Sequence, residues 1–165
     1  MARVVPPLTG ASQTITPAML TSASLPEAAP ALYNGGTTYA LHAEASIATA
    51  HNGFDVYRSI QAANAGHAPD SSPLWWVKTG STFGVWVAGT YALDDRVIDP
   101  AKHLEYLSLV ASNTAALDDQ TKWQLQGPTN RWRAFDVIRS TGATGPSPQS
   151  YVITPGQRID AVGLA

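Results

Sequence analysis

Two stretches of this chain share one pattern: YNGGTTYAL at residues 33–41 and WVAGTYAL at residues 86–93. Each is followed, in one order, by a Tyr-x-Ser segment, an Asn and a Trp. The offset between the copies falls from 53 residues (Tyr33 to Trp86) to 47 residues (Trp76 to Trp123). Several correspondences in one order, with small length changes that loops can absorb, predict an internal duplication.

Each copy predicts a small three-stranded antiparallel sheet. A unit this short is close to the lower size limit for independent folding, so large aromatic side chains must supply most of its core. Gly36 and Gly89 are expected to supply turn geometry that a side chain would resist. A strand is then expected to begin at Tyr39 or Tyr91 and to pair with the Tyr-x-Ser strand. The Trp of each copy closes the sheet.

The whole chain is predicted to be all-β, with four parts. We expect an extended N-terminal arm over residues 1–30, one small β module over residues 31–80 and a second over residues 84–127. Residues 128–165 read as the start of a further C-terminal β domain, a β-sandwich that is incomplete within this chain. Its last two strands are expected around a turn at Pro155 and Gly156.

The N-terminal arm is defined by proline. Five of the twelve prolines lie within residues 1–30, and each pushes the residue before it toward extended backbone. One short helical turn is expected over residues 16–20, with Thr16 as its N-cap and Pro17 at its first position. The remainder of the arm is either disordered or laid on a neighbouring subunit.

Composition excludes several classes of function. Net charge is −2, the pI is near 6.0 and charged residues make up 13% of the chain, against a typical share of roughly 25%. The chain therefore has no basic footprint for nucleic acid and no polybasic membrane patch. No apolar run reaches the length of a membrane span. Without cysteine there is no thiolate zinc site. The low charge, together with five Trp and six Tyr, favours a surface that other subunits cover.

The repeat resembles the small chitin-binding-like carbohydrate-binding modules, whose pattern is an aromatic residue, a Gly-x-x-Tyr turn, two strands and a terminal Trp. A closer similarity is to a group of tailed-bacteriophage virion proteins that place such modules behind an N-terminal arm. The segments that carry this similarity are ITPAMLTS at residues 15–22, WVAGTYALDDRVI at residues 86–98 and GPTNRWRAFD at residues 127–136.

This resemblance implies a structural protein of the virion tail, an adaptor of the baseplate, tail tip or fibre attachment. Its expected partners are other phage tail subunits, in an oligomeric or multi-copy arrangement, with no nucleic acid and no membrane span. The arm and residues 130–136 are expected to dock on those subunits. The residues assigned to this interface are Met19, Leu20, Asn130, Trp132 and Phe135.

No enzyme motif is present: the chain has no nucleophile elbow, phosphate loop or dinucleotide fingerprint. We therefore predict no catalytic residue, no cofactor and no metal site. The four histidines are scattered along the chain and are expected to be solvated. They are His42, His51, His67 and His103.

Carbohydrate binding, to a host cell-surface or cell-wall glycan, is the alternative function. Exposed aromatic rings stack on the apolar faces of sugars, and Trp75, Tyr57 and Tyr106 are the candidates. Trp76 is expected to point inward because it corresponds to Trp123, which leaves Trp75 exposed or covered by a neighbour. The competing interpretation is that every Trp belongs to the core or to a subunit interface.

Overall fold

The computed structural model describes residues 4–5, 19–135, 142–154 and 163–164. These residues form β-strands and contain no α-helix, which confirms the all-β class. In chain order the strands are β1 (Val4–Val5), β2 (Leu20–Ala23), β3 (Glu44–Thr49), β4 (Gly53–Ser59), β5 (Trp76–Val85), β6 (Arg96–Asp99), β7 (Leu104–Ser108), β8 (Trp123–Pro128), β9 (Tyr151–Ile153) and β10 (Gly163–Leu164).

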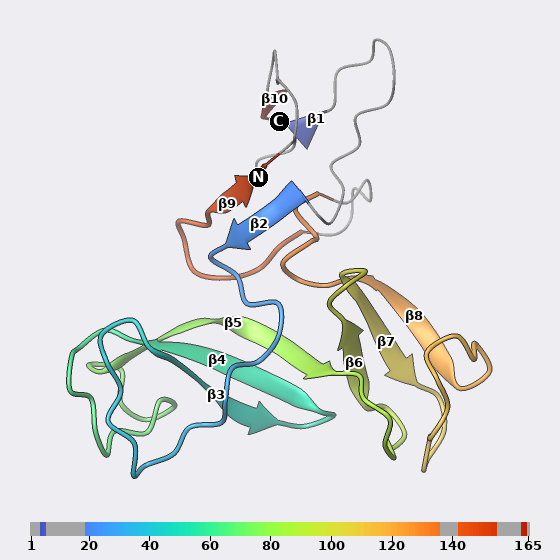
Figure 1. Ribbon diagram of the computed structural model, residues 1–165, viewed down its shortest axis with the longest axis horizontal. Coiled ribbons are helices and arrows are strands. Elements are labelled where there is room, and N and C mark those ends of the chain that lie inside the picture. Colours follow the sequence, from blue (N-terminus) through green and yellow to red (C-terminus); the bar gives the residue numbers. More distant parts are fainter. Residues whose placement is uncertain (1–3, 6–18, 136–141, 155–162, 165) are drawn as a thin grey trace.

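Two three-stranded antiparallel units lie where the two modules are predicted (Figure 1). The first is β3–β4–β5 and the second is β6–β7–β8. The β3–β4 hairpin turns through His51 and Asn52, each with a φ of 57°, the signature of a tight hairpin turn. Residues 100–103 connect β6 to β7 as a tight hairpin loop.

Strand β5 joins the modules into one six-stranded sheet, in the order β3-β4-β5-β6-β7-β8. Its first part pairs with β4, and its last residues pair in parallel with β6, with Gly84 opposite Val97 and Val85 opposite Ile98. This pairing is part of the repeat, because Leu32 forms the same kind of parallel bridge to Ser46 in the first module. The modules are therefore not separate sheets, and the parallel strand of each unit was not foreseen.

The duplication extends to backbone irregularities. The β4–β5 pairing shifts register between Val56 and Tyr57, and the β7–β8 pairing shifts between Glu105 and Tyr106. His42 and Asp94, each two residues before the first strand of its module, occupy corresponding positions and have φ values of 68° and 67°. Equal deviations at equal places indicate that both copies solve one packing problem in one way.

Two expectations about the turns are wrong. Tyr39 and Tyr91 do not begin strands; each forms an isolated bridge, to Asn64 and Asn113 respectively, and the strands begin later. The reason is that each tyrosine ring is needed in the core, where its hydroxyl bonds back to the preceding turn. Among the described glycines only Gly66 and Gly127 have positive φ, so the turn glycines 36 and 89 do not need the freedom assigned to them.

Each module is built around a buried Trp. Trp76 is 3% exposed and Trp123 is 1% exposed, so the prediction that both point inward is confirmed. The nearest tyrosine packs edge-on against each, at 5.0 Å for Tyr39 and 5.2 Å for Tyr91, with 72° between the planes in both modules. Burying an aromatic ring contributes several kcal/mol, of order 3–5 by truncation to Ala. These pairs therefore supply most of each small core.

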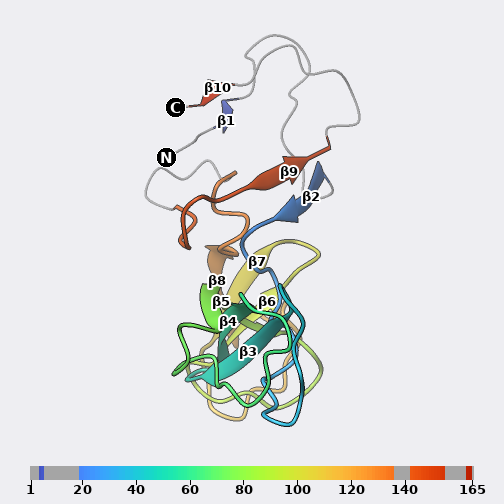
Figure 2. The same cartoon turned by 90° about the vertical axis from the view of Figure 1, so that its left-hand side faces the viewer.

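The terminal segments pair with each other. Strand β2 runs antiparallel to β9, with Leu20 opposite Ile153, and β1 runs antiparallel to β10. Figures 1 and 2 show the β2–β9 ladder projecting from the sheet on the same side as the β1–β10 pair. Because Leu20 and Leu25 are buried, the described part of the predicted arm is laid on its own chain.

The sequence predicts that residues 128–165 begin a further β domain. In the structure the strands of this segment pair with N-terminal strands, β9 with β2 and β10 with β1. Met19, within the predicted helical turn, has 3-10-helical structure, and Leu20 is already the first residue of β2. The rest of that predicted turn, residues 16–18, lies outside the described residues, as does the predicted turn at Pro155 and Gly156.

Candidate functional site

Trp75 is half-buried at the edge of the first module. Its ring stacks on the His67 imidazole, with centroids 3.9 Å apart and planes 13° apart. Trp76 fixes this arrangement from below, since its indole N–H donates to the His67 carbonyl oxygen at 2.8 Å. Trp75 lies beside Leu74, which is 77% exposed, so an apolar surface adjoins the stacked rings.

Tyr57 lies in a charged part of the same module. It is opposite Lys78 in the β4–β5 ladder, and the Lys78 ammonium is 2.7 Å from an Asp55 carboxylate oxygen. Burial, and then the charge of Asp55, raise the pKa of the Tyr57 hydroxyl. The aromatic ring stacked on Trp75 is that of His67, and the described rings show no contact between Trp75 and Tyr57.

Tyr106 borders a hollow of about 700 Å³ on the second module. Its apolar lining includes Leu117, Leu125, which is 55% exposed, and the buried Trp123. Its polar lining consists of Lys102, Asp118, Gln120 and Gln124. A tyrosine ring and apolar side chains with amide and carboxylate groups nearby are the composition of many small-ligand sites.

The first module has different residues at two of the equivalent positions. Lys78 stands where the second module has Leu125, and Pro69, which is buried, stands where it has Leu117. The apolar hollow is therefore a property of the second copy, not of the repeated fold. The three predicted sugar contacts lie at separate places: Trp75 and Tyr57 in the first module, Tyr106 in the second.

The predicted interface residues all make contacts within this chain. Asn130 is 8% exposed; its amide nitrogen donates to the Thr144 carbonyl at 2.7 Å, and its oxygen accepts from the Thr144 backbone N–H at 2.8 Å. The Trp132 and Phe135 rings are tilted against each other, with centroids 5.3 Å apart, and Phe135 packs edge-on to Tyr151 at 5.1 Å. The backbone of Met19 accepts a hydrogen bond from Thr154. Their role as contacts to other subunits stays a prediction.

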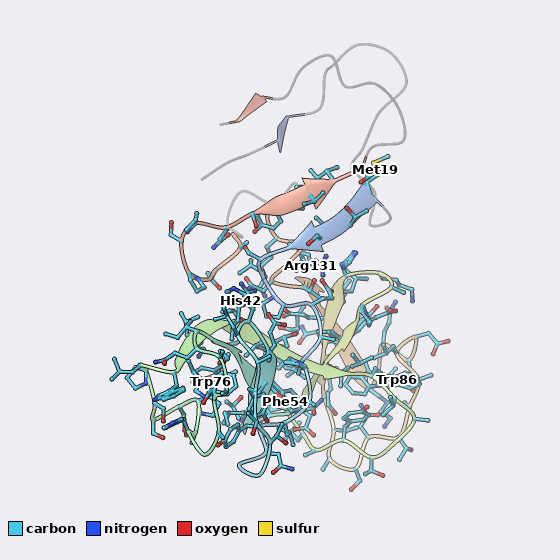
Figure 3. The ribbon with its side chains drawn as sticks, turned by 60° about the vertical axis from the view of Figure 1, so that its left-hand side comes forward. Met19, His42, Phe54, Trp76, Trp86 and Arg131 are labelled. Atoms are coloured by element: carbon cyan, nitrogen blue, oxygen red, sulfur yellow. The ribbon has the colours of Figure 1, made fainter. Side chains whose placement is uncertain are left out.

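The contact between the terminal ladder and the second module is a cluster of charged residues that the sequence did not reveal. Glu27 places one carboxylate oxygen 3.0 Å from His103 Nδ1 and the other 4.0 Å from Arg131 Nε. The Trp132 ring covers the imidazole, 4.9 Å away and nearly parallel. Figure 3 shows Arg131 at the neck between the β2–β9 ladder and the modules.

His103 is consequently a buried residue, 9% exposed, and the expectation that it is solvated is wrong. His42 and His51 are exposed, as predicted, and His67 is half-buried under Trp75. The His103 backbone has a φ of 54° at the end of the β6–β7 turn, and its side chain lies against Glu27. No sequence pattern marks such a partner 76 residues away (27 to 103).

Within the described ranges, no group of three or more His, Cys, Asp or Glu side chains could hold a metal ion. None of the described segments is a helix long and apolar enough to cross a membrane. Comparison of the chain with models of protein families, with curated proteins and with solved structures finds no match.

Proposed function

We propose that this protein is a non-enzymatic structural component of a bacteriophage tail, where it joins other tail subunits through its paired terminal segments. The observation that carries the proposal is the β2–β9 ladder. Both chain ends come together in it, and it stands away from the modules (Figure 2). The kind of assembly, a phage tail, is inferred from the resemblance of the arm, the repeat and residues 127–136 to virion proteins.

The ladder has the properties of a docking element. It has only two strands among the described residues, and a two-stranded sheet is marginal by itself. Its outer edges have no further described strand beside them, and such edges readily accept a strand from another chain. Val152, in the middle of β9, is 53% exposed.

The test uses purified virions of the phage that encodes the chain. Mass spectrometry of tails should find the protein, and Val152→Asp should remove it from assembled tails. Leu93→Asp is the matched control, because Leu93 is 50% exposed on the second module, away from the ladder. Absence of the wild-type chain from tails would overturn the proposal, as would equal incorporation of both variants.

Carbohydrate binding is a second candidate, favoured by the hollow beside Tyr106. The apolar face of a sugar ring would rest on Tyr106, and the nearby amides of Gln120 and Gln124 would bond its hydroxyls. A glycan array and a cell-wall pull-down test this idea with Tyr106→Ala, and with Trp75→Ala as the matched variant in the first module. Binding that neither substitution weakens, or no binding, would contradict it.

A further inference from the structure

A second cavity, of about 600 Å³, lies where the two modules meet the C-terminal segment. Its wall combines Phe54 and Phe83 of the first module with Arg96 and Glu105 of the second. Arg133 and the loop at Pro146 complete it. Three separate parts of the chain form this cavity. It shares no lining residue with the hollow beside Tyr106, and no residue of β2 or β9 lines it.

The repeated fold serves as an internal control for the cavity residues. Val56, fully buried opposite Gly80, corresponds to Glu105, which is 3% exposed opposite Gly127. The first module shows that an apolar valine satisfies the packing at this position. A carboxylate there is costly to bury, so Glu105 has a purpose that the module fold does not supply.

The second charged difference is at the start of the first strand of each module. In the first module that residue is Glu44, which pairs with Arg58 at 3.1 Å. In the second it is Arg96, so the sign of the charge is reversed. Neither side chain is required to make the strand.

Most of the charges in the cavity wall are matched. Lys78 pairs with Asp55 at 2.7 Å, and Arg133 pairs with Glu105 at 3.1 Å. The third cation, Arg96, lies with its guanidinium 5.4 Å from the centre of the Phe83 ring. Within the described part of the chain it has no carboxylate at ion-pair distance and donates no side-chain hydrogen bond. Three cations against two carboxylates leave the wall with one positive charge in excess.

A guanidinium beside an aromatic ring, with no carboxylate paired to it, suits one kind of partner. Its planar fork of N–H donors matches the two oxygens of a carboxylate. The remaining wall offers the Phe83 ring and Pro146 for an apolar or ring-shaped body. A volume of this size is in the usual range for small-molecule sites.

We propose that this cavity binds a small ligand carrying one carboxylate, which the Arg96 guanidinium receives in a bidentate manner while the body of the ligand rests on Phe83 and Pro146. The carboxylate can belong to an acidic sugar or to the C-terminal end of a peptide. The proposal does not depend on the role of the chain in a tail, and it concerns a different place from the candidate sugar contacts.

The test is a titration of the full ¹⁵N-labelled chain, followed by NMR, with two matched pairs of probes. One pair is N-acetyl-alanyl-alanine and its C-terminal amide; the other is methyl glucuronoside and methyl glucoside. We expect the carboxylate member of one pair to shift the amide signals of Phe83, Arg96 and Thr144. Its neutral partner should bind at least about tenfold more weakly. The pair that responds identifies the source of the carboxylate.

Three variants make the result specific. Arg96→Gln should weaken binding of the carboxylate probe about tenfold or more, and Arg96→Lys should recover only part of it because the charge returns without the fork. Arg58→Gln, an arginine on β4 outside the cavity wall, should leave binding unchanged. The proposal is overturned if neutral and charged probes bind equally, if Arg96→Gln binds as the wild type does, or if no probe moves these signals.

Discussion

One carboxylate oxygen of Glu27 lies 3.0 Å from Nδ1 of His103, although the two residues belong to different parts of the chain. The Glu27 backbone carbonyl accepts a hydrogen bond from the Thr82 hydroxyl, so this one residue contacts the first module with its backbone and the second with its side chain. Both side chains are about nine-tenths buried. Glu27 therefore holds the N-terminal segment and the two modules in one arrangement.

Substitution of Glu27 by Gln should destabilise the protein by about 3 kcal/mol, because it removes the partner of the buried His103 and Arg131. Chemical denaturation, followed by tryptophan fluorescence, measures the change in the free energy of unfolding. Glu44→Gln is the matched control: the Glu44–Arg58 pair is more than a third exposed on both sides and should contribute less than about 1 kcal/mol. Equal losses in the two variants would show that Glu27 has no special role.

The asparagines that close the two modules should be equivalent. The Asn64 and Asn113 amides each donate to a buried Ser hydroxyl, at 3.0 and 3.1 Å, and each also donates to the carbonyl of the residue just before a strand. Substitution of either by Ala should cost about 2 kcal/mol, because it leaves buried acceptors without donors. Gln120→Ala, on the exposed surface, should change the unfolding free energy by less than about 0.5 kcal/mol. Strongly unequal losses at 64 and 113 would contradict the structural equivalence.

A methyl group at Gly145 should disturb the contact between the chain ends. A Cβ at this position would collide with the terminal methyl of Leu25, which is 2% exposed and has little room to move. Gly145→Ala should destabilise the protein by about 1–3 kcal/mol, with faster amide hydrogen exchange in β2 and β9. Gly89→Ala is the control, because its nearest atom would be at an ordinary 3.8 Å. Unchanged exchange in the Gly145 variant would show that Leu25 gives way.

Glu105 makes the stability depend on pH. Burial raises the pKa of its carboxyl above the ordinary 4.5, and the nearby Arg133 and then Arg96 oppose that rise. The folded state therefore binds this proton more tightly than the unfolded chain does. Its contribution is fully present below pH 4.5 and is lost as the pH rises through the higher folded-state pKa.

Glu105→Gln cannot titrate, so the difference in unfolding free energy, wild type minus variant, should fall as the pH rises from 4.5 to neutral. The slope cannot exceed about 1.4 kcal/mol per pH unit, the limit for one proton. Denaturation of both proteins across this range measures it. Parallel curves would mean that Arg133 cancels the effect of burial, and a difference that grows with pH would mean that Arg133 outweighs it.

The repeat was predictable because its features are local. Tyr39 and Trp76 lie within one copy, and the pattern of aromatic, glycine and β-branched residues indicates short strands without knowledge of any other part of the chain. The direction of Trp76 also followed from its correspondence with Trp123. The starts of the strands did not, because the bridge between Tyr39 and Asn64 places the tyrosine in the core before the strand begins.

The candidate sites were less predictable. Trp75, Tyr57 and Tyr106 were identified by residue type, but whether they share a surface depends on how the modules are arranged. Arg96 and Glu105 drew no attention, since a charged residue on a short strand is normally solvated. Their meaning comes from comparison with Glu44 and Val56, which requires the register of both sheets.

By itself, then, the sequence determined the all-β class, the two modules and their aromatic cores, because each of these depends on contacts between residues less than about fifty positions apart, as the repeat period requires. Only the tertiary structure decided the parallel junction of β5 with β6, the pairing of β2 with β9 and the contact of Glu27 with His103. Those associations join segments whose own patterns are satisfied by many partners. The packing of the whole chain selects among these partners, because it must bury side chains such as Leu25 and Glu105.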